Sequence, residues 1–348
     1  MLLEGIFPAA TTPFYPDGRL YLKKLEHNVD RHSRTPVAGI VILGSTGEAV
    51  MLGDEESRQV LHTAREAASP EKVLIAGVAR ESVAETLRLA EYAAEQQYDA
   101  VLVRTPSYYS YGSLEMLTYY RAVADRSPLP VIVYSIPKFA RYEIPANVVA
   151  ELAQHSNIVG VKDSSSSVER IAALAAATRN APRREVMVTQ TFAAYTTRMM
   201  LAESMIESNF VAIESLAGAV VTAPPPLRVK AMRKKEVGFQ ILTGAANQLF
   251  DSLNAGASGG ILALAACAPQ ACQEIYTAWK ENDPALAASK QQRVEQASRI
   301  VLSKLGIPGI KHACDLNGYY GGRPRLPLLP LDAEQQAEVA RLMSDLRN

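Results

Sequence analysis

The stretch NIVGVKDSSSS, residues 157–167, contains the pattern that decides the fold. It begins as a short run of β-branched and apolar residues, which is typical of a strand buried on both faces. The run stops at Lys162, and an aspartate and four serines follow before a helical pattern at 168–178. A buried strand that ends in polar residues and leads into an amphipathic helix predicts one βα unit of a parallel sheet.

The same unit recurs along the whole chain. Eight runs have this character: GIFPA (5–9), AGIVILG (38–44), KVLIAGV (72–78), DAVLVRT (99–105), LPVIVYS (129–135), NIVGVK (157–162), GFQILTG (238–244) and GGILALA (259–265). Eight consecutive βα units predict an α/β fold of the (β/α)8 type, a TIM barrel. The alternative is a doubly wound open sheet, but no GxGxxG follows any run to supply the dinucleotide-binding turn of that fold.

The predicted barrel covers residues 1–283 and carries one insertion between its sixth and seventh strands. The inserted segment, about residues 181–236, includes TFAAYTTRMMLAESMIES (191–208), PPP (224–226) and RVKAMRKK (228–235). Because it follows the helix after the sixth strand, we expect it at the bottom of the barrel, away from the carboxyl ends of the strands. A helical protrusion used in subunit contacts, or a disordered loop, is favoured over a catalytic lid. Residues 284–348 predict a C-terminal helical extension, with helices at 284–304 and 332–347.

The composition argues against several kinds of partner. Lys plus Arg and Asp plus Glu are equal at 36 each, so there is no basic excess for nucleic acid. The longest apolar stretches, such as 217–226, are too short and too interrupted by proline to span a membrane. The five histidines form no HxH or HxxxH pair, so we expect neither a metal nor another cofactor.

The three cysteines form no CxxC pair and no even disulfide framework, which favours core positions and a reducing compartment. The first strand-like run begins at Gly5 and leaves no room before it for a signal peptide. We therefore expect a cytoplasmic protein.

Polar residues at the ends of the predicted strands are the candidates for chemistry, because active sites of such barrels lie at the carboxyl ends of the strands. These ends carry GSTGE (44–48) after the second strand, TPSYY (105–109) after the fourth, Tyr134 on the fifth, Lys162 on the sixth and TGAAN (243–247) on the seventh. A single strand-end lysine is usually solvated or ion-paired. Lys162 becomes a candidate catalytic group because the other polar strand ends are expected to lie around it at the same end of the barrel.

Lys162 is the candidate nucleophile. An amine must be uncharged to attack a carbonyl, and apolar surroundings at a barrel mouth favour the uncharged form. The resulting Schiff base withdraws electrons from the substrate, so a carbon–carbon bond can break without a metal. Tyr134 is the candidate for moving protons if it is coupled to a hydroxyl such as that of Thr46. The alternative for Tyr134 is a rim aromatic with a satisfied hydroxyl.

The glycine-flanked turn Gly44–Thr46 offers backbone N–H groups and two hydroxyls, which suits a substrate carboxylate. An ordinary βα turn that caps a helix has the same composition. The segment GASGG (256–260) matches the GxSxG pattern of hydrolases, but its apolar run follows the serine instead of preceding it, so we interpret it as a turn.

Together, GSTGE, VYSIP, GVKDSS and GIPGIKHACDLNGYYGGRPRLPL form a specific set of motifs. On these motifs, over essentially the whole chain apart from the insertion, the sequence resembles the dihydrodipicolinate synthase and N-acetylneuraminate lyase family of Schiff-base-forming (β/α)8 aldolases. The resemblance implies that Lys162 forms the Schiff base with pyruvate and that Tyr134 relays protons.

The same resemblance implies further roles. Ser45 and Thr46 would hold the pyruvate carboxylate, and Ser164 and Gly244 match positions that contact substrate. Tyr108 would reach into the site of a neighbouring subunit across a tight dimer, within a homotetramer built as a dimer of dimers.

Within the family, the segments SPLPVIVYSIP, QHSNIVGVKDS and GIPGIK are most similar to 4-hydroxy-2-oxoglutarate aldolase, which implies cleavage to pyruvate and glyoxylate. Dihydrodipicolinate synthases typically carry an arginine five residues after the tyrosine, where this chain has Phe139, although Lys138 and Arg141 lie nearby. Synthase activity is the alternative, together with 2-keto-3-deoxy sugar-acid aldolase and N-acetylneuraminate lyase activities. Because the insertion has no counterpart in the family pattern, a catalytically silent barrel that binds a 2-oxo acid is the non-enzyme alternative.

Overall fold

Eight parallel strands form the centre of the protein. The computed structural model describes residues 2–188 and 233–346. The strands of the barrel are β1 (Gly5–Pro8), β2 (Gly39–Ile42), β3 (Val73–Gly77), β4 (Ala100–Arg104), β5 (Val131–Ser135), β6 (Ile158–Asp163), β9 (Gln240–Thr243) and β10 (Gly259–Leu262). Their order in the sheet is β1-β10-β9-β6-β5-β4-β3-β2. Each predicted run therefore contains one strand, and the predicted eight βα units are confirmed.

The outermost strands of this order, β1 and β2, meet and close the sheet. Ala9, which follows β1, forms a parallel bridge with Val41 of β2. The Ala38 N–H donates to the Ile6 carbonyl at 2.9 Å, and the Ala10 N–H donates to the Val41 carbonyl at 3.0 Å. The fold is a TIM barrel, as predicted, and the doubly wound alternative is wrong.

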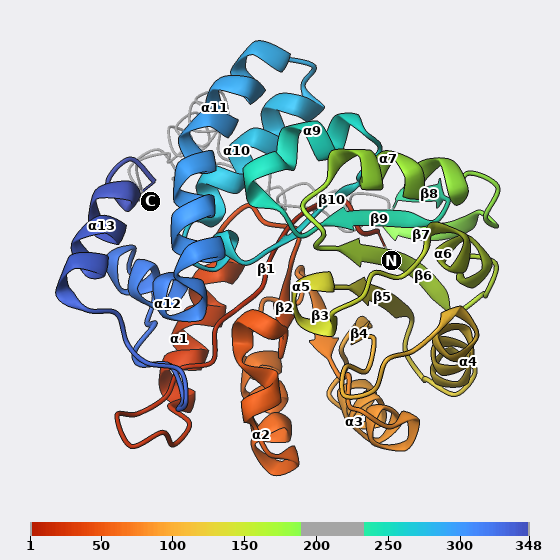
Figure 1. The fold of residues 1–348 in the computed structure, drawn as a ribbon, viewed down its shortest axis with the longest axis horizontal. Coiled ribbons are helices and arrows are strands. Elements are labelled where there is room, and N and C mark those ends of the chain that lie inside the picture. The colour runs from red at the N-terminus through yellow and green to blue at the C-terminus, as the bar shows by residue number, and fades with distance from the viewer. Residues whose placement is uncertain (1, 189–232, 347–348) are drawn as a thin grey trace, which may run out of the picture.

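Helices follow the strands and surround the barrel (Figure 1). They are α1 (Leu22–Ser33), α2 (Asp54–Ala67), α3 (Val83–Glu95), α4 (Ser113–Ala124), α5 (Pro137–Ala140), α6 (Ala146–Leu152), α7 (Val168–Ala177), α9 (Leu249–Asn254) and α10 (Pro269–Lys280). Their apolar faces pack on the sheet; on α2, Val60, Leu61 and Ala64 are buried. The turn after β2 is a short 3-10 helix, Ser45–Gly47.

The interior of the barrel is a packed apolar core. Inward-facing strand residues fill it: Phe7, Val41, Val73, Ile75, Ala100, Leu102, Ile132, Leu242 and Ile261. All of them are buried. Because side chains occupy this space, a substrate can be bound only at an end of the barrel.

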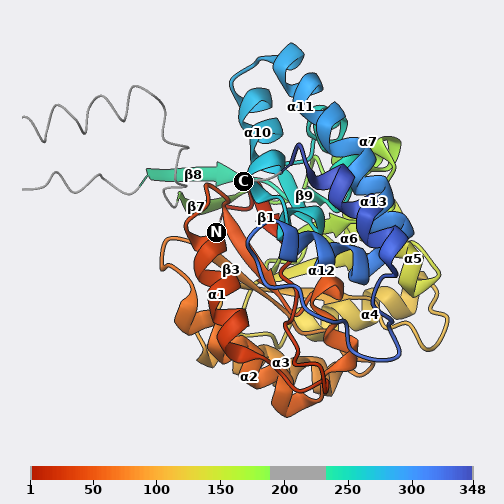
Figure 2. The same ribbon diagram turned by 90° about the vertical axis from the view of Figure 1, so that its left-hand side faces the viewer.

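The segment between α7 and β9 contributes two strands that the sequence did not predict. β7 (Arg184–Val188) and β8 (Arg233–Val237) pair antiparallel and form a separate sheet, which projects from the barrel (Figure 2). Arg184 donates to the Ile158 carbonyl at the start of β6, and Lys235 pairs with Glu4, just before β1. Both contacts place β7 and β8 at the amino ends of the barrel strands, so the expected position at the bottom of the barrel is confirmed for this pair. The helix-like and proline-rich parts of the insertion lie outside the described residues, and its role in subunit contacts stays a prediction.

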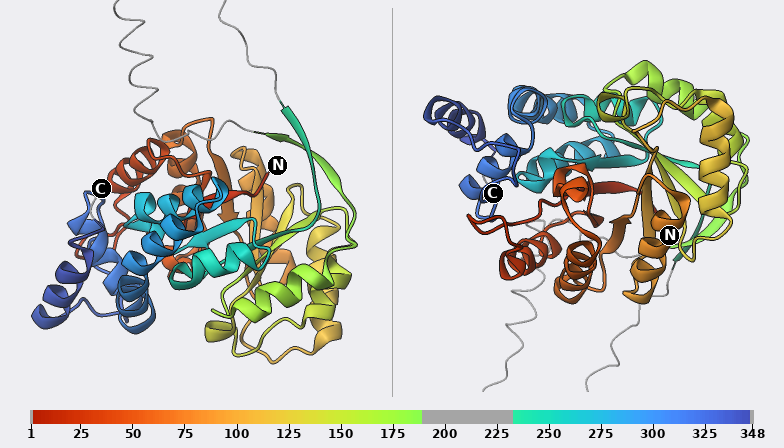
Figure 3. Two further views of the ribbon diagram at one scale, coloured as in Figure 1. Left: turned by 90° about the horizontal axis from the view of Figure 1, so that it is seen from above. Right: turned by 60° about the horizontal axis from the view of Figure 1, so that its bottom comes forward.

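The C-terminal extension is helical, as predicted. It consists of α11 (Pro284–Ala297), a π-helical continuation (Ser298–Lys304), α12 (Gly306–Leu316) and α13 (Ala333–Met343). These helices gather on one side of the barrel, shown in blue (Figure 3). The sequence did not predict α12, which buries Ile310 and Ala313. A division into domains at residue 283 stays a prediction.

Within the described ranges, no helix is both long and apolar enough to cross a membrane. In the same parts of the chain, no three His, Cys, Asp or Glu side chains gather where they could bind a metal ion. The cytoplasmic location stays a prediction.

The three cysteines are free and buried, as expected for core residues. Burial raises the pKa of Cys272 and of Cys314 to about 12, so both thiols stay protonated at neutral pH. We expect the folded protein to show no fast reaction with Ellman's reagent at pH 8, and all three cysteines to react after unfolding in guanidinium chloride. A thiol that reacts within seconds in the folded protein would contradict this prediction.

Candidate active site

Lys162 and Tyr134 lie side by side at the carboxyl ends of β6 and β5. Their Cα atoms are partners in the parallel register, so both side chains point into the mouth of the barrel. The Lys162 Nζ lies 4.0 Å from the centroid of the Tyr134 ring. Each residue is 5% exposed. Among the described residues no carboxylate forms an ion pair with Lys162, so its nitrogen is free to meet a carbonyl group.

The turn after β2 carries Ser45 and Thr46. It forms the 3-10 helix Ser45–Gly47, and the Thr12 hydroxyl donates to the Gly47 carbonyl at 2.6 Å. The first N–H groups of such a turn have no partner within the turn itself. Two hydroxyls and these N–H groups suit a carboxylate, and the binding of the pyruvate carboxylate by Ser45 and Thr46 stays a prediction.

A small pocket at the mouth connects this turn to the strand ends. It is lined by Gly44 and Ser45 from the turn, by Tyr134 and Arg104 from β5 and β4, and by apolar side chains. Neither Lys162 nor Thr46 lines it. In the described part of the chain no hydrogen bond joins Thr46 to Tyr134, so the proposed coupling of their hydroxyls stays a prediction.

Ser164 and Gly244 are brought into contact where β6 and β9 end. The Gly244 N–H donates to the Asp163 carbonyl at 2.7 Å. A Cβ atom at position 244 would lie 2.0 Å from the Ser164 Oγ and 2.9 Å from its Cβ, so any larger residue at position 244 would force Ser164 to move. Ser164 follows Lys162 by two residues, and the pairing of β6 with β9 brings Gly244 beside Ser164. Their contact with substrate stays a prediction.

Tyr108 is largely exposed in its own chain. It lies in the loop after β4, is 81% exposed and packs edge-on against the Tyr109 ring at 5.0 Å. The backbone N–H groups of Ser107 and Tyr108 donate to Glu81 Oε2 at 3.0 and 3.1 Å, which anchors this loop. Within one chain Tyr108 therefore does not join Tyr134; its insertion into a neighbouring subunit's site stays a prediction.

The segment after Lys162 is held in place by Asp163, which the sequence did not single out. Asp163 is buried and lies 3.4 Å from the Arg170 guanidinium of α7. Its Oδ1 accepts the Ser165 N–H at 3.0 Å, and Ser166 adopts a φ of 60°. These contacts fix the turn that follows the candidate nucleophile.

A buried ion pair connects the GSTGE turn to the C-terminal extension. Glu48 Oε1 lies 2.6 Å from Lys311 Nζ of α12, and both side chains are 0% exposed. Lys311 also donates to the Arg323 carbonyl at 3.0 Å, and Glu48 accepts the Arg325 N–H at 2.8 Å. Burial lowers the pKa of Lys311, and the Glu48 carboxylate opposes this shift. The extension therefore supports the turn that carries Ser45 and Thr46.

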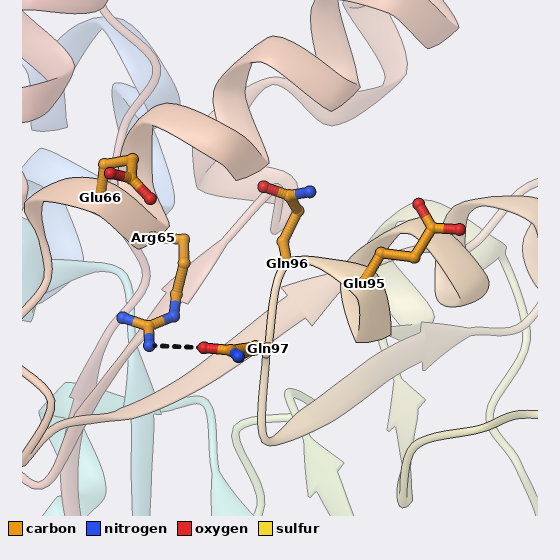
Figure 4. A pocket seen from close by; sticks show the side chains of 5 residues that line it. All are labelled: Arg65, Glu66, Glu95, Gln96 and Gln97. Atoms are coloured by element: carbon orange, nitrogen blue, oxygen red, sulfur yellow. Dashed lines mark hydrogen bonds between the residues drawn. The ribbon is translucent and has the colours of Figure 1, made fainter.

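A second depression lies between α2 and α3 (Figure 4). It is lined by Arg65, Glu66, Glu95, Gln96 and Gln97, and Arg65 donates to the Gln97 side chain at 3.2 Å. Its lining comes from the C-terminal ends of both helices, and it shares no residue with the candidate site.

A (β/α)8 barrel with an amine, a phenol and hydroxyls at the carboxyl ends of its strands has the architecture of an enzyme. The chain belongs to the dihydrodipicolinate synthetase family, whose model matches residues 2–182 and 201–346. Its homologues are carbon–carbon lyases, and so is this protein. The family predicted from the sequence motifs is confirmed.

Several relatives carry the name 4-hydroxy-tetrahydrodipicolinate synthase. The chain is 26% identical over 348 residues to that of Methanothrix thermoacetophila, covering 99% of this chain and 98% of the relative. It is 27% identical over 345 residues to that of Acidiphilium cryptum, covering 99% of each. A relative from Xanthomonas campestris is 36% identical over 176 residues, which is 51% of this chain and 58% of the relative.

Solved structures show the same fold. A prophage protein of the dihydrodipicolinic acid synthase family from E. coli K12, in complex with pyruvate, has a TM-score of 0.78 at 24% identity and covers 99% of both chains. N-acetylneuraminate lyase from Mycoplasma synoviae has a TM-score of 0.72 at 21% identity, covering 99% of this chain and 98% of that one. These comparisons do not support the particular similarity to 4-hydroxy-2-oxoglutarate aldolase.

Proposed function

We propose that the protein is a class I aldolase that joins pyruvate to an aldehyde, or cleaves the product, through a Schiff base on Lys162. The observation that carries this proposal is the buried Lys162 amine, free of an ion pair among the described residues and lying on the Tyr134 ring at the barrel mouth. The pyruvate complex of the related E. coli protein supports pyruvate as the donor.

In the proposed reaction, the Lys162 Nζ attacks C2 of pyruvate, and loss of one water gives an iminium ion. Removal of a proton from C3 leaves an enamine, whose C3 forms the new bond with the aldehyde carbon. The aldehyde oxygen takes up a proton, and water then releases the product and the free amine. Tyr134 is the nearest phenol for these proton transfers, and the Ser45–Thr46 turn is placed to hold the pyruvate carboxylate.

The names of the relatives favour 4-hydroxy-tetrahydrodipicolinate synthase activity, with aspartate semialdehyde as the acceptor, over the 4-hydroxy-2-oxoglutarate cleavage expected from the sequence. Phe139 stands where synthases typically have arginine, and this keeps glyoxylate as the second candidate acceptor. Both readings share the pyruvate step. A homotetramer, with Tyr108 completing a neighbouring site, belongs to the same proposal; one structural neighbour is a monomeric variant.

Borohydride trapping tests the proposal directly. The protein is incubated with pyruvate and reduced, and the adduct is located by mass spectrometry of peptides. We expect one stable adduct, on Lys162, and pyruvate-dependent turnover with aspartate semialdehyde or glyoxylate. An unmodified Lys162 would refute the Schiff base on Lys162.

Replacing Tyr134 with phenylalanine is expected to lower turnover by about 10²- to 10⁴-fold, the usual contribution of a positioned acid–base group. The pyruvate adduct should still be trapped, because Lys162 is unchanged. Tyr92→Phe, on the outer helix α3, is the matched control and should keep wild-type turnover. Equal rates for Tyr134→Phe and the wild-type protein would exclude the proton relay.

A further inference from the structure

Arg104 carries a positive charge at the barrel mouth and has no role in the proposed reaction. Along β4, Ala100 and Leu102 face the barrel interior, and Val101 and Val103 face the helices. Arg104 continues the inward series because side chains alternate along a strand. Its Cα atom is the register partner of Tyr134, so Arg104, Tyr134 and Lys162 lie on the same face of the sheet at the carboxyl ends of three neighbouring strands.

The side chain is held in position and is only 17% exposed. Its Nη1 donates to the Thr105 carbonyl at 2.9 Å and to the Ser107 hydroxyl at 3.3 Å, and its Nη2 donates to Glu81 Oε1 at 2.9 Å. A guanidinium has five N–H donors. In the described part of the chain, the Nε–H and one N–H of Nη2 are therefore left for another acceptor.

Arg104 lines the same small pocket as Ser45 and Tyr134, and the rest of that pocket is mostly apolar. The apolar lining consists of Leu43, Ala49, Val50, Ala79 and Leu102. Among apolar neighbours, the two remaining donors match the two oxygens of a carboxylate, which a guanidinium binds in bidentate geometry.

The basic residues near Phe139 are less suited to this task. Lys138 donates to the Ser303 carbonyl at 3.2 Å, so its amine is directed to the C-terminal extension. Arg141 is exposed, in a left-handed conformation with a φ of 65°, and does not line the pocket. Of the three basic side chains, Arg104 alone lines the pocket that reaches Tyr134.

We propose that Arg104 binds the carboxylate of the acceptor aldehyde and makes the enzyme selective for acidic acceptors. This inference rests on the proposed function, because it assigns the second substrate of the same site. The pyruvate carboxylate occupies the Ser45–Thr46 turn, and the acceptor carboxylate occupies the Arg104 side of the mouth. An aldehyde without an acidic group leaves the two free donors of Arg104 without a partner.

Arg104→Met tests this assignment, because methionine keeps an unbranched side chain and removes the charge and the donors. We expect kcat/KM for glyoxylate and for aspartate semialdehyde to fall about 10- to 100-fold. With the neutral aldehydes glycolaldehyde and propionaldehyde, kcat/KM should change by less than about 3-fold. Arg121→Met, which breaks an exposed pair with Glu151 on the outer helices, is the matched control and should leave all four values unchanged.

Two further measurements separate this inference from the proposed function. Borohydride trapping with pyruvate should give the wild-type yield in Arg104→Met, since Lys162 is intact. If the wild-type protein traps no pyruvate, the proposed function is refuted, but the binding of a carboxylate by Arg104 is not. Calorimetric titration with malonate, an unreactive dicarboxylate, should then still show weaker binding to Arg104→Met. The inference is overturned if Arg104→Met lowers kcat/KM equally for acidic and neutral acceptors, or if malonate binds Arg104→Met as tightly as the wild-type protein. It is also overturned if Arg141→Met, and not Arg104→Met, causes the selective loss of kcat/KM for acidic acceptors.

Discussion

Lys162→Arg is expected to abolish turnover and the trapped pyruvate adduct while the protein stays folded. Arginine remains protonated at any accessible pH and cannot attack a carbonyl, so no Schiff base can form. We expect turnover to fall by at least about 10⁴-fold, which corresponds to roughly 5 kcal/mol of lost transition-state stabilisation. The substitution keeps an unbranched side chain of similar volume beside the Tyr134 ring, so the circular dichroism spectrum should not change.

The measurement is pyruvate-dependent turnover together with peptide mass spectrometry after borohydride reduction. Lys280→Arg is the matched control, because Lys280 is largely exposed on α10 and pairs with Glu4 at 3.0 Å, a contact that arginine can keep. This control should retain wild-type turnover and the adduct. If Lys162→Arg kept more than about a hundredth of the wild-type rate, another group would have to be the nucleophile.

Lys311→Met is expected to give the largest loss of stability. It leaves the Glu48 carboxylate fully buried without its partner, and removal of one member of a buried pair costs about 3–5 kcal/mol. Because Glu48 belongs to the GSTGE turn, the KM for pyruvate should also rise as Ser45 and Thr46 lose their fixed positions. The free energy of unfolding, measured in urea, and the KM for pyruvate report these two effects separately.

The double variant Glu48→Gln/Lys311→Met should recover most of the lost stability, because it removes the uncompensated charge. Arg299→Gln, which breaks an exposed pair with Glu295, is the matched control and should cost about 0–1 kcal/mol. A loss for Lys311→Met as small as this control would show that the buried pair contributes nothing.

The sequence predicted the barrel because its strands are mostly apolar along both faces, with polar residues near their ends. Runs such as 72–78 and 129–135 can be buried only between the barrel interior and a layer of helices, and the structure places β3 and β5 there. The strands β7 and β8 were missed because they carry many charged residues and lie outside the main core, so their pairing leaves little trace in hydrophobic pattern. The sequence likewise did not reveal α12, whose glycines and proline oppose a helix assignment.

Part of the candidate site was predicted from the polar residues that end the apolar strands. Lys162 and Tyr134 end neighbouring strands, and the carboxyl ends of parallel strands meet at one end of a barrel. Arg104 was missed, although it ends an apolar strand in the same way as Lys162, and this position was a usable signal. The pairing of Glu48 with Lys311 had no such signal, since the two residues lie far apart in the chain.

By itself, then, the amino-acid sequence determined the number of barrel strands, their burial and the polar residues at their carboxyl ends, because these follow from local hydrophobic pattern. Only the tertiary structure decided that Tyr108 is exposed in its own chain, that Arg104 shares a pocket with Tyr134 and Ser45, and that Lys311 reaches Glu48. These relations depend on strand register and on how the C-terminal helices pack, and neither is encoded in any short stretch of the chain.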